Sequence, residues 1–141
     1  MMSDSGDPVV APADHTRTLY EQLGGEAGVR ALVDRFYDLM DMDADLQPLR
    51  ALHGPGLESA REKLRLFLSG YLGGPDLYVQ RYGHPRLRAR HLPFAIDAKA
   101  RDLWLVCMGR ALQDLQVPQP LAERLLHGFY GVADWMRNRE G

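Results

Sequence analysis

The stretch Gly-His-Pro-Arg-Leu-Arg-Ala-Arg-His-Leu-Pro-Phe at residues 83–94 says most about the fold and chemistry of this chain. It places His91 at the end of an arginine-rich segment, which Pro93 then cuts short. Three arginines precede this histidine at alternate positions: Arg86, Arg88 and Arg90. Basic side chains therefore surround a potential metal ligand within one or two short turns.

Haem matches this segment in two ways. Imidazole is a common axial ligand of haem iron, and guanidinium groups grip carboxylates such as the haem propionates through paired hydrogen bonds. An acidic partner protein or a nucleic acid would also attract the arginines, but neither would require His91. No recognised nucleic-acid reading motif accompanies the arginines, so we expect no nucleic-acid partner.

Composition predicts one soluble domain. The chain has 141 residues, of which 45% are hydrophobic, and a formal net charge of -2. This length and apolar content are typical of a single globular domain, and the charge gives no general attraction to anionic membranes. The single cysteine, Cys107, excludes an internal disulfide and a cysteine-based zinc site. We expect a cytoplasmic protein with no membrane partner, because no segment approaches the ~20 apolar residues that span a bilayer.

Four segments carry apolar residues at helical spacing, and none sustains the alternation of a strand. We predict helices over residues 26–40, 57–72, 97–115 and 120–136, and therefore an all-α fold. Asp97 is the expected N-cap of the third helix. The segment between the second and third helices is long for a compact domain, and a cofactor wrapped by it would explain its length.

Residues 1–17 contain Asp, Ser, Pro and Gly and no long apolar run, and they lack the basic start and apolar core of a signal peptide. We expect a disordered N-terminal tail over residues 1–17, a single domain over residues 18–138 and a short C-terminal tail over residues 139–141.

Five blocks of sequence point to a known family. In chain order they are Leu19-Tyr20 with Leu23-Gly24-Gly25, Arg35-Phe36-Tyr37, Tyr71-Leu72-Gly73-Gly74-Pro75, Gly83-His84-Pro85-Arg86-Leu87-Arg88 with Arg90-His91, and Arg101-Asp102-Leu103-Trp104 with Cys107-Met108. Together they resemble the truncated haemoglobins of the second group over residues 18–138. The resemblance implies a two-over-two helical sandwich around haem b. It also implies that the segment after Pro75 is a proximal loop, largely unwound compared with ordinary globins.

On the proximal side, the resemblance implies that His91 is the ligand of the iron. A backbone carbonyl is expected to accept the second ring proton and to orient the imidazole. Arg88 is the first choice for a haem propionate, because arginine forms paired contacts. Further candidates for cofactor contacts are Tyr78, Lys63, Arg61 and Phe94.

On the opposite face, the resemblance implies a hydrogen-bonding distal pocket above a five-coordinate iron. Whether Tyr37 or His53 ever binds the iron directly, which would give a six-coordinate form, stays open. Its expected donors are Tyr37, Trp104 and His53. Ala60 and Leu64 fall at the distal-helix positions that face the ligand in this family. Core packing is the alternative role for Trp104, and a partly exposed aromatic is the alternative for Tyr37. The register of His53 stays open, because the loop over residues 43–56 looks longer than in many relatives.

The resemblance implies binding of O2, NO, CO or peroxide. Two distal donors, each worth ~1.5–3 kcal/mol, would slow ligand release by roughly 10²–10⁴-fold. Slow release favours redox or nitrosative-stress chemistry, such as peroxidase or nitric oxide dioxygenase activity supported by an unidentified reductase. Non-catalytic oxygen binding, transport, storage or sensing shares every sequence feature and is the alternative. A monomer and a homodimer are both compatible with the sequence.

Overall fold

The computed structural model of the protein describes residues 17–140. The expected N-terminal tail over residues 1–17 therefore lies outside the described residues apart from Arg17, and so does the last residue of the chain. Arg139, expected in the C-terminal tail, donates its backbone amide to the carbonyl oxygen of Ile96 at 3.1 Å.

The described part of the chain folds into helices alone, which confirms the all-α prediction. The elements are α1 (Leu19–Leu23), α2 (Gly25–Met42), the 3-10 helix η1 (Ala44–Leu46), α3 (Gln47–Arg50), α4 (Glu58–Tyr71), α5 (Leu77–Tyr82), α6 (Leu87–His91), α7 (Ala98–Asp114) and α8 (Gln119–Trp135). The four long helices agree with the predicted ones to within one or two residues at each end. None of the described helices has the length and apolar character needed to cross a membrane.

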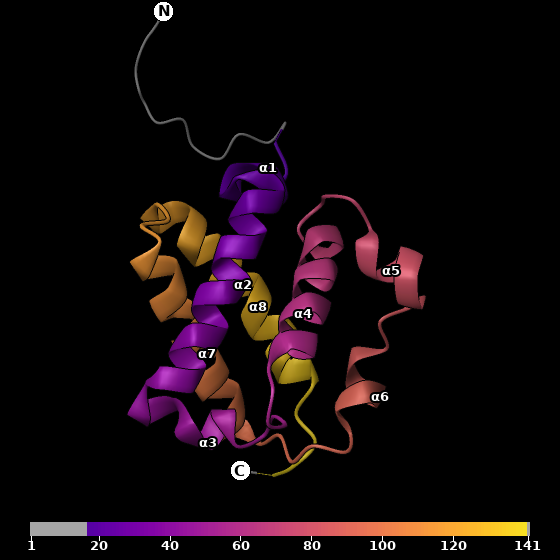
Figure 1. The fold of residues 1–141 in the computed structure, drawn as a ribbon, viewed down its shortest axis with the longest axis vertical. Coiled ribbons are helices and arrows are strands. Elements are labelled where there is room, and N and C mark those ends of the chain that lie inside the picture. Colours follow the sequence, from indigo (N-terminus) through magenta and orange to yellow (C-terminus); the bar gives the residue numbers. More distant parts are fainter. Residues whose placement is uncertain (1–16, 141) are drawn as a thin grey trace, which may run out of the picture.

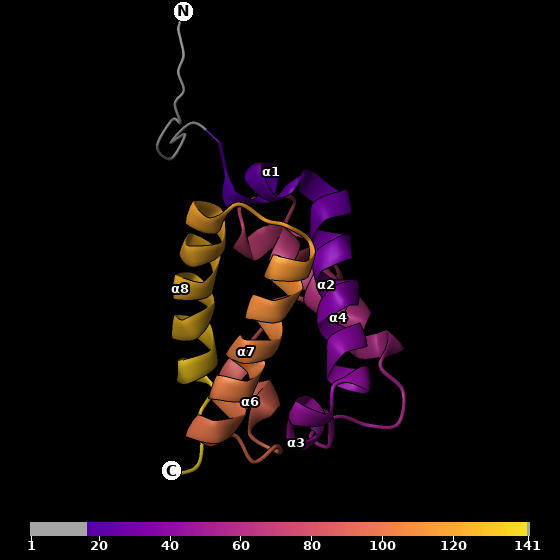
Figure 2. The same ribbon diagram turned by 90° about the vertical axis from the view of Figure 1, so that its left-hand side faces the viewer.

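The long helices form two layers, as expected for a two-over-two sandwich. Helices α2 and α4 make one layer and α7 and α8 make the other (Figure 1 and Figure 2). The layers meet mainly where α2 crosses α7. Their apolar faces supply the largest fully buried side chains, among them Phe36, Met40, Met108, Leu112, Leu125 and Phe129. Burial of these faces drives the association of the layers.

The proximal segment is less unwound than expected. It contains two short helices, α5, which packs against α4, and α6, which ends at His91. Gly83 separates them with a φ of +81°, and Arg86 precedes α6 in the left-handed region with a φ of +47°. The two helices give the segment backbone hydrogen bonds of its own and fix where His91 leaves the chain.

Glycines make the close turns at the start of the fold. Gly24 has a φ of +116° and joins α1 to α2, a conformation that other residues adopt at a cost. Gly74 follows α4, and a Cβ atom there would lie 2.5 Å from the ring of Tyr20. Glycine at these positions therefore lets α1 lie against α2 and against the end of α4.

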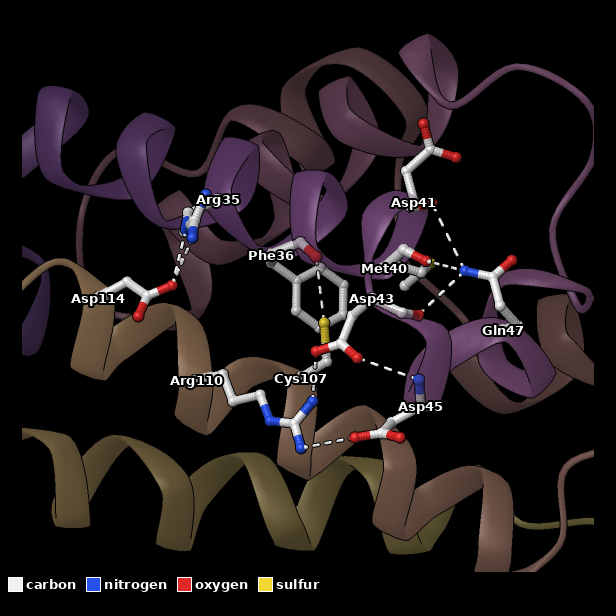
Figure 3. A network of polar contacts seen from close by, with 10 residues as sticks. All are labelled: Arg35, Phe36, Met40, Asp41, Asp43, Asp45, Gln47, Cys107, Arg110 and Asp114. Carbon is white, nitrogen blue, oxygen red and sulfur yellow. Dashed lines mark hydrogen bonds and ion pairs between the residues drawn. The ribbon is translucent and has the colours of Figure 1, made fainter.

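Polar contacts fasten α2 to α7 on both sides of the core (Figure 3). At one end the Nε of Arg35 donates to Asp114 at 2.8 Å. At the other end Arg110 pairs with Asp43 and Asp45 just after α2. Pairs exposed to this degree contribute ~0–1 kcal/mol each, so their main effect is to fix how the two helices lie.

Cys107 is fully buried between α2 and α7, and its thiol donates to the carbonyl oxygen of Phe36 at 3.1 Å. Burial raises the pKa of this thiol to about 12, and repulsion by Asp43 adds to the increase. The thiolate is therefore scarce at neutral pH, as expected for a cysteine that serves packing.

We predict opposite effects for alanine at two helical glycines. A Cβ atom at Gly28 would lie 2.1 Å from the carbonyl oxygen of Leu23, whereas at Gly131 it would meet nothing within 4 Å. Gly28→Ala should lose ~1–3 kcal/mol of unfolding free energy, because backbone must move. Gly131→Ala should gain up to ~1 kcal/mol from improved helix propensity.

Thermal unfolding followed by circular dichroism measures both variants, with the unmodified protein as reference. A melting temperature for Gly28→Ala equal to that of Gly131→Ala would contradict the tight packing of α1 on α2.

Candidate haem site

His91 is held in one orientation at the end of α6. Its Nδ1 lies 2.7 Å from the carbonyl oxygen of Leu87, one turn earlier. A carbonyl only accepts, so Nδ1 carries the proton and Nε2 of the neutral ring keeps its lone pair. The side-chain amide of Asn138 also donates to the backbone carbonyl of His91 at 3.1 Å. The arrangement includes the carbonyl partner that the sequence analysis expected, and it leaves Nε2 able to bind a metal.

His53 lies in the turn after α3 and is held in the same way. Its Nδ1 is 3.1 Å from the carbonyl oxygen of Leu49. Burial lowers the pKa of His53, the bond to Leu49 opposes this, and the charges of Arg50 and His91 lower the pKa further. The ring is therefore neutral at pH 7, and its Nε2 presents a lone pair. This differs from the donor role expected from the sequence, since the ring proton is already given to Leu49.

Tyr37 is buried on α2 with 5% of its surface exposed. Its ring meets those of Phe36 and His53 edge to face, at centroid distances of 4.9 Å and 5.9 Å. Burial raises the pKa of Tyr37 well above its usual value, so the hydroxyl keeps its proton. That hydroxyl makes no hydrogen bond with any residue between 17 and 140. A buried donor without a partner costs about 1–3 kcal/mol, which a hydrogen-bonding ligand would recover.

Trp104 lies in the other layer and contacts the same aromatic ring, that of Phe36, as Tyr37 does. Its ring on α7 lies 5.2 Å from that of Phe36 and 5.8 Å from that of Phe129. Its indole N–H donates to none of the residues that the structure describes. Ala60 and Leu64 on α4 are half-buried and pack against the same core. The fold thus gathers the residues expected on the distal side.

A second group of side chains joins α4, α5 and α6. The Nζ of Lys63 lies 5.8 Å from the ring centre of Tyr82, and the rings of Tyr82 and Tyr78 are 5.0 Å apart. The guanidinium of Arg90 lies 6.0 Å from the ring centre of Tyr78. Lys63 and Arg90 thus flank two tyrosines and make a cluster suited to carboxylates. Arg90 lies in the basic segment but is not among the propionate contacts predicted from the sequence, because the side that each arginine takes depends on where α6 begins.

Arg88 lies elsewhere. Its Nη1 donates to the carbonyl oxygens of Trp135 and Arg137, both at 2.7 Å, and its guanidinium lies over the ring of Trp135. It therefore caps the end of α8, where carbonyl groups lack helical partners. The propionate contact expected of Arg88 gains no support from this arrangement.

Arg61 is also engaged with protein groups. Its Nη2 donates to Asp38 at 2.8 Å, and its Nη1 donates to the backbone and side chain of Asp34. These bonds tie α4 to α2 beside Tyr37, whose ring centre lies 5.8 Å from the guanidinium carbon. Arg61 thus connects the helices of one layer.

The side chains around these groups fit a flat, largely apolar cofactor with an iron at its centre. Two imidazoles offer free Nε2 atoms, and two donors, the buried Tyr37 and the half-buried Trp104, have no protein partner among the described residues. Phe94, with its ring 6.1 Å from that of His91, is 43% exposed, and the neighbouring Leu92 is 51% exposed. Haem would cover such apolar surface and satisfy the iron-binding and hydrogen-bonding groups. Two surface hollows of about 240 and 260 Å³ lie along α4, and neither is lined by a histidine, Tyr37 or Trp104.

Comparison with known proteins agrees with this fit. The family model described as bacterial-like globin matches residues 18–138. The chain is 40% identical over 120 residues to the group 2 truncated haemoglobin YjbI of Bacillus subtilis, an alignment that covers 85% of this chain and 88% of that protein.

Solved structures give the same result. A cold-adapted truncated haemoglobin from Pseudoalteromonas haloplanktis TAC125 is 48% identical, with a TM-score of 0.82 over 87% of this chain and 99% of that one. The group II 2-on-2 haemoglobin of Agrobacterium tumefaciens is 40% identical, with a TM-score of 0.84 over 92% of this chain and 100% of that one. The chain therefore belongs to the bacterial-like globins as a group II truncated haemoglobin, a haem b protein that binds diatomic ligands such as dioxygen.

Proposed function

We propose that this protein retains dioxygen for long periods and uses it in redox chemistry that removes nitric oxide, with peroxide as a further oxidant that it consumes. The observation that carries this proposal is the buried hydroxyl of Tyr37, which has no hydrogen-bond partner in residues 17–140. When bound, haem supplies an iron that takes diatomic ligands and exchanges single electrons.

On the proximal side, His91 is the proposed iron ligand through Nε2. Its hydrogen bond to the Leu87 carbonyl, at 2.7 Å, orients the ring and makes Nε2 a better electron donor. Asn138 holds the backbone of His91 from the C-terminal segment. The ligand is therefore fixed by two contacts before haem enters.

The propionates are proposed to lie against Lys63, Tyr78 and Arg90. These side chains form one cluster through Tyr82, and both cations are exposed at its edge. A lysine and an arginine there neutralise carboxylate charge, and the tyrosine hydroxyl adds a donor. Arg88 is assigned to the end of α8 instead.

We predict that Arg90→Ala and Lys63→Ala each speed haem loss about fivefold, the effect of ~1 kcal/mol from a partly solvated ion pair. Transfer of haem to an excess of a haem-free acceptor globin measures this rate. Arg30→Ala serves as the control, because Arg30 is an exposed arginine on α2 paired with Glu26. Faster loss from Arg88→Ala than from Arg90→Ala would reverse the assignment.

On the distal side, Tyr37 and Trp104 are proposed to donate hydrogen bonds to the ligand. Dioxygen is a strong acceptor at this position, and each bond of this kind contributes ~1.5–3 kcal/mol. The donors come from different layers, so they approach the ligand from two directions. A truncated haemoglobin from Bacillus subtilis, 37% identical to this chain with a TM-score of 0.78, is described as oxygen-avid. We extend that property to this chain.

We predict that Tyr37→Phe and Trp104→Phe each speed dioxygen release by about 10–100-fold, the factor that corresponds to ~1.5–3 kcal/mol. Stopped-flow displacement of dioxygen by carbon monoxide measures the release rate. Tyr130→Phe is the matched control, since Tyr130 is an exposed tyrosine on α8. Fast release from the unmodified protein, unaltered in both site variants, would contradict the proposal.

Slow release of dioxygen suits a redox reaction at the iron better than it suits oxygen delivery. One nitric oxide, one dioxygen and one electron combine to give one nitrate. The reaction therefore needs dioxygen that stays bound until nitric oxide arrives, and it needs a source of electrons. Tyr37 and Trp104 hold the dioxygen in place, and the small side chain of Ala60 leaves room for a second diatomic molecule to approach. A separate cytoplasmic reductase is the proposed electron source.

We predict continuous nitrate formation when the haem-loaded protein is supplied with nitric oxide, oxygen and a chemical or enzymatic reductant. Tyr37→Phe should lower turnover, because dioxygen escapes before nitric oxide arrives. Nitrate and remaining nitric oxide are measured together, with His127→Ala as a control on the exposed side of α8. Slow dioxygen release combined with no nitrate turnover would favour storage or sensing instead.

A further inference from the structure

Arg61 covers the ring of Tyr37 at the place where α4 lies beside α2. Its guanidinium carbon lies over that ring, 5.8 Å from the ring centre. The side chain of Arg61 is 28% exposed, whereas Tyr37 is 5% exposed. The aromatic rings that contact Tyr37, those of Phe36 and His53, meet it edge to face. A single charged side chain therefore lies between water and one face of the tyrosine that is proposed to bind the ligand.

Three hydrogen bonds hold Arg61 in this position. Its Nη1 donates to the backbone carbonyl and to the carboxylate of Asp34 at 3.1 Å and 3.3 Å, and its Nη2 donates to Asp38 at 2.8 Å. These bonds cross from α4 to α2, which lie side by side in one layer (Figure 1). We call the bonds from Arg61 to Asp34 and Asp38 the Arg61 latch.

The surface is hollowed on both sides of Arg61. One hollow of about 240 Å³ and another of about 260 Å³ lie along α4, and Arg61 lines both of them. Tyr37 lines neither hollow. Ala60, the residue before Arg61, adds little bulk at this position. Movement of the Arg61 side chain into water would therefore remove the group that divides the hollows and would uncover the ring of Tyr37.

The Arg61 latch has the strength of a contact that opens often. The carboxylates of Asp34 and Asp38 are about half exposed, at 54% and 47%. Ion pairs with this exposure are weak, and salt weakens them further. Surface side chains change rotamer within nanoseconds once they are released, which is fast compared with ligand exchange. The rate of ligand entry through this place would therefore be proportional to the fraction of molecules in which the latch is open.

We propose that the Arg61 latch is a gate to the distal side of the haem site, and that diatomic ligands enter and leave beside Tyr37 while Arg61 is turned into water. This inference rests on the proposed function, in which Tyr37 binds the ligand. A gate and a donor have different kinetic effects. Tyr37 contacts the bound ligand, so it slows release. A latch that is equally strong with and without ligand slows entry and release by the same factor and leaves the affinity unchanged.

Carbon monoxide kinetics of the ferrous, haem-loaded protein test the gate. Flash photolysis measures entry, and stopped-flow replacement of carbon monoxide by nitric oxide measures release. In Arg61→Ala both rates should rise about 5–30-fold, the factor for two partly exposed ion pairs, with an unchanged dissociation constant. Arg65→Ala is the matched control, because Arg65 lines one of the hollows from the same helix and lies 4.0 Å from Glu26. Unchanged rates in Arg61→Ala, or a change in one rate alone, would overturn the proposal.

Removal of the carboxylates gives an independent test of the latch. Asp34→Ala combined with Asp38→Ala leaves Arg61 in the chain without its partners, so both carbon monoxide rates should rise as they do in Arg61→Ala. Both rates should also increase with ionic strength in the unmodified protein, because salt screens exposed ion pairs, and they should not do so in Arg61→Ala. Acceleration by Arg61→Ala without acceleration by the paired aspartate variant would overturn the latch, since the bulk of the side chain would then limit entry.

Oxidative labelling gives a readout that does not depend on ligand kinetics. A brief pulse of hydroxyl radicals on the haem-loaded protein, followed by mass spectrometry of its peptides, reports the exposure of Tyr37. Labelling of Tyr37 should increase in Arg61→Ala, whereas Tyr130, which is exposed on α8, should be labelled equally in both proteins. Equal labelling of Tyr37 in the two proteins would overturn the gate. Fast dioxygen release from the unmodified protein, with parallel acceleration of both carbon monoxide rates in Arg61→Ala, would contradict the proposed function and leave the gate standing.

Discussion

The site depends on the crossing of α2 and α7 at Phe36. This side chain is fully buried, its ring contacts those of Tyr37 and Trp104, and its carbonyl accepts from Cys107. A single residue thereby sets the spacing between a donor on one layer and a donor on the other. Close packing makes that spacing rigid, since cores transmit small displacements rather than absorb them. Replacing the ring would move both donors together.

A packed core also explains how the fold tolerates unsatisfied groups. Each buried donor without a partner costs about 1–3 kcal/mol, a large share of the net stability of a domain. Tyr37 is buried and Trp104 is half-buried, and both are kept in place by aromatic contacts and by the ion pairs that join α2 to α7. In the proposed site, a bound ligand that accepts hydrogen bonds would recover this free energy. The unsatisfied donors lie at the candidate site, and the helices around it supply the stability.

The sequence predicted the helices of the two layers better than it predicted which cationic side chain lies near the propionates. Helical periodicity and Asp97, whose side chain accepts from Ala100 at 2.8 Å, located the long helices because these patterns are local. To decide whether Arg88 or Arg90 lies near the propionates, one must know where α6 begins. That start depends on the left-handed backbone conformation of Arg86, which no sequence pattern predicts. The lone pair on His53 was equally hidden, since it follows from a carbonyl whose position only the folded turn reveals.

The side chains proposed for the distal side are of two kinds, and the difference between them affects which ligands the iron would bind. Tyr37 and Trp104 offer protons, whereas His53 offers a lone pair. In the proposed site the two donors return free energy only to a ligand that accepts hydrogen bonds well. They would therefore favour dioxygen over a poor acceptor of similar size, and the selection would follow the chemistry of the ligand.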